Sequence, residues 1–158
     1  MFKVIRNFFH RPVKIEKSWK IALMVMAIIG ICDTSYLTYA HYEDKILNCF
    51  GHTQVNSCQV VAQSAYSTVL GVPISLIGLA FYIFVLTISW MSLKDKFTFL
   101  LNTLLPLSVL AFLFSIRLTY LQVYVIQSIC YYCLISAFIS IMLLLVSMVI
   151  YQKMNLPE

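Results

Sequence analysis

Two cysteines, Cys130 and Cys133, stand three residues apart where a long apolar run begins. On a helix, residues at this spacing share a face, so their sulfurs can bond to each other. A helix N-terminus also presents unpaired N–H groups and the positive end of the helix dipole, which stabilise a thiolate. The pair is therefore predicted to be a redox-active dithiol at a membrane boundary, and the chain must supply it with electron partners.

The composition predicts a single-domain integral membrane protein. Of its 158 residues, 61% are apolar and only 11% are charged, whereas charged residues make up about a quarter of an ordinary soluble domain. The formal charge of +5 is concentrated ahead of the first apolar run and in one short connector, which is the pattern of a topogenic signal. No base-reading or stacking motif accompanies this charge, so nucleic-acid binding is not expected.

Four apolar runs are each near the length needed to cross roughly 30 Å of hydrocarbon as a helix. We therefore expect an all-α fold, a four-helix membrane bundle. The expected segments are a basic head 1–19, a membrane domain 20–151 with spans at about 20–40, 73–91, 97–120 and 129–151, and a tail 152–158.

The lysines and arginines predict how this bundle is oriented. Nine lie on the side of the two termini and the turn 92–96, and only Lys45 and Arg117 lie on the other. The positive-inside rule then places both termini in the cytoplasm and the long loop between the first two spans outside. Cys49 and Cys58 in that loop share the outer face with the start of the fourth span. In a bacterium this is the oxidising face, where disulfides persist.

Three roles for these four thiols follow from their chemistry. They could form two structural disulfides, bind zinc, or pass electrons from one pair to the other by thiol–disulfide exchange. Zinc sites usually need two tight ligand turns, whereas eight residues separate Cys49 from Cys58. A structural role leaves the position of one pair at a span boundary unexplained. The fifth cysteine, Cys32 inside the first span, is expected to be a small buried hydrophobe.

A longer series of motifs resembles the bacterial vitamin K epoxide reductase (VKOR) family, whose members are quinone-linked oxidants of periplasmic thiols. The similarity covers most of residues 20–150. The motifs are Ser35-Tyr36-Leu37-Thr38-Tyr39-Ala40-His41, then Cys49 and Cys58, Val60-Val61-Ala62-Gln63-Ser64-Ala65-Tyr66-Ser67, Gly71-Val72-Pro73-Ile74-Ser75-Leu76-Ile77-Gly78, and Cys130-Tyr131-Tyr132-Cys133.

The resemblance implies a four-helix bundle that encloses a quinone, ubiquinone or menaquinone, under a short helix after the loop pair. Cys49 would be the outer shuttle thiol that meets the redox partner, Cys58 would exchange with Cys130, and Cys133 would face the quinone ring. Ser64 matches a polar residue near the quinone, although a local backbone hydrogen bond is an equal alternative. Some relatives carry a fused thioredoxin-like domain; here we expect a separate DsbA-like protein as electron donor.

Two other interpretations and one residue stay open at this point. A DsbB-type quinone reductase would catalyse the same overall reaction, but its cysteine pairs come in the reverse order. A four-span scaffold or transport subunit could use the cysteines only to brace its outer loops. Asp33 lies inside the first span, where a charge costs about 2.5–3.5 kcal/mol. It is expected to face the bundle or to be protonated, and to act either as a proton acceptor or in a hydrogen bond between helices, with Arg117 as a candidate partner.

Overall fold

The computed structural model describes residues 15–42, 57–94 and 100–155. The predicted all-α membrane bundle is confirmed, because four long helical segments have the length and apolar composition needed to cross a membrane. They are α2 (Lys17–Tyr42), α4 (Ile74–Ser92), the third segment Leu100–Ile126, which contains α5 (Leu104–Tyr120) and the π-helical turn η2 (Leu121–Ile126), and α6 (Tyr131–Asn155).

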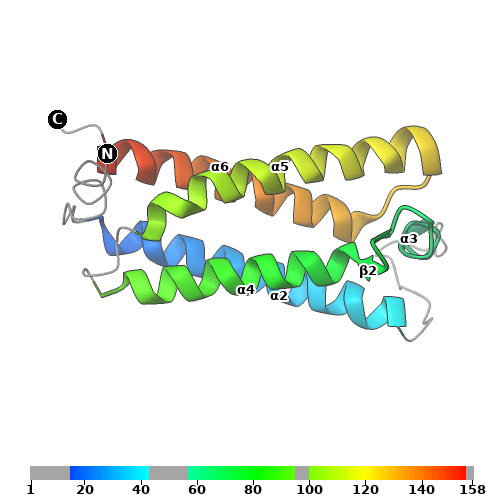
Figure 1. The fold of residues 1–158 in the computed structure, drawn as a ribbon, viewed down its shortest axis with the longest axis horizontal. Helices are drawn as coiled ribbons and strands as arrows, with labels where there is room; N and C mark the ends of the chain where they lie inside the picture. Colours follow the sequence, from blue (N-terminus) through cyan, green and yellow to red (C-terminus); the bar gives the residue numbers. More distant parts are fainter. Residues whose placement is uncertain (1–14, 43–56, 95–99, 156–158) are drawn as a thin grey trace.

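Each membrane-spanning helix packs against particular neighbours in the bundle. Helix α2 packs mainly against α4 and also against α6, and α5 packs mainly against α6. Helix α2 begins and α6 ends at the same end of the bundle, on the left in Figure 1. The short helix α3 (Ser57–Ala62) lies at the opposite end.

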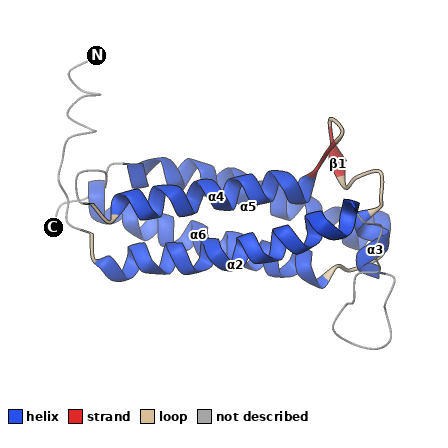
Figure 2. Ribbon diagram, turned by 90° about the horizontal axis from the view of Figure 1, so that it is seen from below, coloured by secondary structure: helices blue, strands red, loops and turns tan. Residues whose placement is uncertain are grey.

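A two-stranded hairpin leads from α3 into α4 and projects from the same end of the bundle (Figure 2). Its strands are β1 (Thr68–Val69) and β2 (Val72–Pro73), which pair antiparallel. The two residues between them, Leu70 and Gly71, have φ values of 53° and 80°. Positive φ at both central residues is the geometry of a tight hairpin turn, and a glycine adopts it without steric cost.

The helix surfaces are adapted to lipid rather than to water. Large apolar side chains are exposed along all four helical segments, for example Val25, Phe84, Leu113 and Leu145. Hydroxyl groups on the helices bond back to a carbonyl one turn earlier, as when the Thr87 Oγ1 donates to the Ile83 carbonyl over 2.8 Å. In hydrocarbon such bonds are needed because no water is present to satisfy a polar group.

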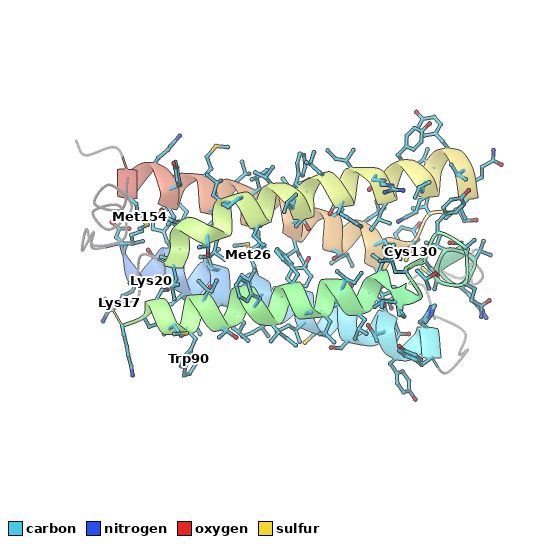
Figure 3. The ribbon with its side chains drawn as sticks, in the orientation of Figure 1. Lys17, Lys20, Met26, Trp90, Cys130 and Met154 are labelled. Carbon is cyan, nitrogen blue, oxygen red and sulfur yellow. The ribbon has the colours of Figure 1, made fainter. Side chains whose placement is uncertain are left out.

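One half of the bundle is filled by a continuous apolar cluster. Its buried side chains come from all four helical segments and include Leu23, Ala27, Val85, Leu101, Leu104, Leu143 and Ile150. This half also contains a buried hydrogen bond between two helices. The Lys20 side chain is 1% exposed, and its Nζ donates to the Ser92 carbonyl over 2.7 Å. This bond ties the start of α2 to the end of α4, at the end of the bundle opposite Cys130 (Figure 3).

Tyr82 of α4 forms the inner boundary of this filled half. A Cβ atom on Gly30 would lie only 2.6 Å from the Tyr82 ring, so the ring can cross α2 only where that helix has no side chain. The Tyr82 hydroxyl lies 3.1 Å from the Ser136 Oγ of α6. Tyr82 therefore spans the bundle, with apolar packing on one side of it and an open cavity on the other.

Candidate functional site, a dithiol in the wall of an apolar cavity

The dithiol lies where α6 begins, and a tight turn positions it. The π-helical turn η2 ends at Ile126, and the left-handed φ of 53° at the next residue, Gln127, redirects the chain. Cys130 precedes α6, and its carbonyl accepts the Leu134 N–H over 3.1 Å as the first bond of the helix. Cys133 lies in the first turn of α6. Both cysteines are thus at the N-terminal end of a membrane-spanning helix.

The two thiols are free and bonded to each other by a hydrogen bond. Cys130 is buried and Cys133 is half-buried. The hydrogen bond from the Cys133 side chain lowers the pKa of the Cys130 thiol, although burial opposes this effect. The backbone N–H groups of Cys133 and Tyr132 also point at the Cys130 sulfur and lower its pKa further. The helix N-terminus therefore favours a thiolate at Cys130, which stands just outside the span.

Cys58 packs beside this dithiol from another element. It lies on α3, is completely buried and takes part in a disulfide. The other three described cysteines, Cys32, Cys130 and Cys133, are free, so none of them is its partner. Cys58 and Cys130 belong to one buried cluster with Leu37, Ala40 and Val61. Cys49, the predicted shuttle thiol, lies outside the described residues.

Helix α3 is held over this end of the bundle by the end of α2. The His41 Nδ1 lies 3.0 Å from the Ala62 carbonyl; since a carbonyl can only accept, the ring donates from Nδ1. A second contact joins α2 to α6, where the Tyr36 and Tyr132 rings are 5.0 Å apart between centroids. These contacts position Cys58 relative to the start of α6.

A cavity of about 310 Å³ opens on the inner side of the dithiol. Both Cys130 and Cys133 contribute to its wall, together with residues of α2, α4, α5 and α6. The wall is mainly apolar, with residues such as Leu37, Phe81, Leu107, Leu110, Phe114 and Leu118, and a few polar groups that include Thr34, Gln122 and Ser136. A pocket of this size, apolar with a few placed polar groups, is typical of a site for a small apolar ligand.

Ser64, predicted from the resemblance to lie near a quinone, is placed beside the cavity but not in its wall. Its Oγ donates to the Val61 carbonyl over 2.8 Å, which is the local backbone bond considered as the alternative. Ser67, three residues later, does line the cavity, and its carbonyl accepts the Ile74 N–H over 2.9 Å.

Two expectations about the first span need correction. Cys32 is exposed on α2 rather than buried, because a small apolar side chain can face lipid as well as protein. Asp33 has a buried Oδ2 atom with no hydrogen-bond partner among the described residues, so Arg117 does not bond to it. Asp33 nevertheless acts electrostatically on Cys130 and on Tyr82, so its carboxyl group lies within electrostatic reach of the site.

The sequence did not single out two of the polar residues at this site. Gln122 is 3% exposed and lines the cavity, and the available signal was an amide in an apolar stretch eight residues before Cys130. Tyr82 gave no such signal, because a tyrosine in an apolar span is equally expected at a lipid interface.

A four-helix membrane bundle that holds a free dithiol in the wall of an apolar cavity, beside a disulfide, has the parts of a membrane thiol oxidoreductase. A comparison with protein families supports this class, because the model of the vitamin K epoxide reductase family matches residues 21–148. The chain belongs to the vitamin K epoxide reductase family, whose members are membrane thiol oxidoreductases that use quinones. A search of curated proteins found no match to this chain.

Proposed function

We propose that this chain is a quinone-dependent oxidoreductase that generates disulfides on the outer face of a bacterial cytoplasmic membrane. Its electron donor would be a separate thioredoxin-like, DsbA-like protein, and its electron acceptor would be ubiquinone or menaquinone. The observation that carries this proposal is the position of two free thiols, Cys130 and Cys133, in the wall of an apolar cavity and against the disulfide-bonded Cys58.

A quinone bound in this cavity would accept two electrons and two protons and leave as a quinol. Cys130 and Cys133 would supply both electrons and both protons as a dithiol and would become a disulfide. Cys133 is the thiol assigned to the quinone side, and Cys130 the thiol that closes the bond. The lowered pKa of Cys130 suits this second role, because a thiolate is the attacking species in disulfide formation.

The remaining steps return the dithiol to its reduced state. The dithiol of the partner protein first reduces the Cys49–Cys58 disulfide and is itself oxidised. The freed Cys58 thiolate attacks the Cys130 sulfur, which breaks the Cys130–Cys133 bond and releases Cys133. Cys49 then attacks Cys58, forms the Cys49–Cys58 disulfide again and releases Cys130. A state with Cys58 bridged and Cys130 and Cys133 free is therefore the state ready to reduce quinone.

This path requires the orientation that the charge distribution predicts. The basic head 1–19 and the tail 152–158 would lie in the cytoplasm, and the membrane domain 20–151 would carry the four thiols at its outer face. The arrangement of the helices supports this orientation. Helix α2 begins and α6 ends at one end of the bundle, and α3 lies at the opposite end. The filled half then lies toward the cytoplasm and the cavity toward the outer face.

The test is quinone reduction by the purified protein in detergent, driven by dithiothreitol, with short-chain ubiquinone and menaquinone analogues. We expect Cys133→Ala to lower the rate at least about 100-fold, because the thiol is covalently involved in the reaction. Cys32→Ala is the matched control and should leave the rate unchanged, since Cys32 is exposed away from the cavity wall. Cys49→Ala should block oxidation of a DsbA-like protein while small dithiols still drive the reaction.

Two results would overturn the proposal. Failure to reduce either class of quinone would exclude a quinone-linked enzyme. A Cys133→Ala variant that lost thermal stability but kept quinone reduction would show that the cysteines only brace the fold.

A further inference from the structure

Gln122 connects the turn before the dithiol at three points. Its backbone carbonyl accepts the N–H of Gln127, the residue that follows η2, and the N–H of Ser128 over 3.1 Å. Its side-chain Oε1 accepts the Cys130 N–H over 3.1 Å. A single residue therefore fixes the path from the third membrane segment into α6. A π-helical turn at this place is consistent with a functional role, because such turns are frequent at functional sites.

The second half of the Gln122 amide is directed at the other thiol. A carboxamide has an oxygen that accepts and an NH₂ group that donates. The oxygen is used by the Cys130 N–H over 3.1 Å, and the same side chain lines the cavity with Cys133 and acts on that thiol as a hydrogen-bonding group. Since Gln122 is 3% exposed and lines the same cavity as both thiols, water does not compete strongly for these bonds. The NH₂ group is thus available to the Cys133 sulfur on the cavity side.

We propose that Gln122 is the positioning residue of the dithiol, holding Cys130 through its acceptor and stabilising negative charge on the Cys133 sulfur through its donor. The role rests on the proposed function only in that the charge on Cys133 would develop during exchange with Cys58 and reaction with quinone. An N–H donor stabilises a thiolate more than a thiol, and in a water-poor site this preference is enlarged. The acceptor and the donor of this amide have different roles, so each role can be tested separately.

Two substitutions separate the acceptor from the donor. Gln122→Glu keeps an oxygen for the Cys130 N–H but replaces the donor with a group that repels a thiolate. Gln122→Lys keeps a donor, with a positive charge, but loses the acceptor. The readout is the rate at which iodoacetamide alkylates Cys133 in the reduced protein across pH, assigned by fragment-ion mass spectrometry, together with the melting temperature. This measurement needs no quinone, so it does not depend on the success of the proposed function.

We expect opposite effects on Cys133. In Gln122→Glu alkylation at neutral pH should slow roughly tenfold and reach half its maximum at a higher pH, because the rate follows the thiolate fraction. In Gln122→Lys alkylation should be faster than in the unchanged protein, while the melting temperature falls because the Cys130 N–H loses its acceptor. Gln127→Glu, an exposed position five residues later, is the matched control and should change neither property.

The proposal fails if Gln122→Glu and Gln122→Lys change Cys133 alkylation in the same direction, because both would then report only a distorted turn. It also fails if both leave the pH profile of Cys133 unchanged. If the profile moves in opposite directions but no variant reduces quinone, the positioning role stands and the proposed function does not.

Discussion

The half of the bundle at which α2 begins and the half at which it ends differ in how they fill the space between the helices. In the first half, apolar side chains from all four segments close the interior, and Lys20 and Ser92 are joined by a hydrogen bond. In the second half, beyond Tyr82, the same helices leave a cavity of about 310 Å³ with two free thiols in its wall.

Buried polar atoms sharpen the difference between the halves. Ser108 and Ser147 are paired between α5 and α6 over 3.1 Å. Among the described residues, two buried side-chain atoms have no partner: the Asn102 Oδ1, just before α5 begins, and the Asp33 Oδ2 beside the site. A neutral amide costs less to bury than a carboxyl group. The more costly group lies next to the chemistry, so stability and activity should be separable by mutations in the two halves.

Among the substitutions that test the difference between the two halves, the largest effect is expected from filling the cavity. Ala111 of α5 lines it, so Ala111→Phe should occupy space that a quinone needs and lower kcat/KM for quinone by roughly 30- to 100-fold. Because the new ring enters an empty space, the melting temperature should not fall. The two quantities are measured by steady-state quinone reduction and by thermal unfolding in detergent.

Ala80→Phe is the matched control for that experiment. Ala80 lies on α4, is exposed and does not line the cavity, so its replacement should change neither kcat/KM nor stability. If Ala111→Phe instead lowers the free energy of unfolding by about 1–3 kcal/mol, as overpacking of a filled core would, the two halves do not differ in packing.

The contrast between the halves also explains what could be predicted from sequence. Apolar run length predicted four membrane-spanning helices, because hydrocarbon thickness fixes the length of a span. The cysteine spacing predicted a dithiol at a helix start, and the structure places Cys130 and Cys133 there. Both predictions depend on local sequence or on the membrane itself.

The rest of the site depends on contacts between distant segments. The approach of Tyr82 to Gly30 and the reach of Gln122 across the turn to Cys130 are set by packing, which leaves no periodic signal. Ser64 is a further example. The resemblance predicts that it lies near a quinone, and the partner that its hydroxyl takes, the Val61 carbonyl, is set by the turn after α3 rather than by the motif.

A smaller effect, on stability alone, is expected from Lys20→Met. The substitution removes a charged hydrogen bond at the C-terminal end of α4, where a cation also interacts favourably with the helix dipole. We expect the free energy of unfolding to fall by about 2 kcal/mol, while kcat and KM for quinone stay unchanged. Lys17→Met removes the same charge from an exposed position and should have little effect on either. A loss of activity in Lys20→Met at temperatures where it remains folded would show that the filled half contributes to catalysis.

The smallest effect is expected from Asp33→Asn, and it tests whether the unpaired carboxyl group acts on the dithiol. The charge of Asp33 raises the pKa of the Cys130 thiol, and it is the weakest of the influences on that group, behind the hydrogen bond from Cys133, burial and two backbone N–H groups. Removing the charge should therefore move the alkylation profile of Cys130 to lower pH, so that Cys130 reacts faster at neutral pH. Asn102→Ala removes the other unpaired group, in the filled half, and should leave this profile unchanged. If Asp33→Asn moved the profile to higher pH, the carboxyl group would be supporting the Cys130 thiolate instead, and Asp33 would belong to the site as a proton acceptor.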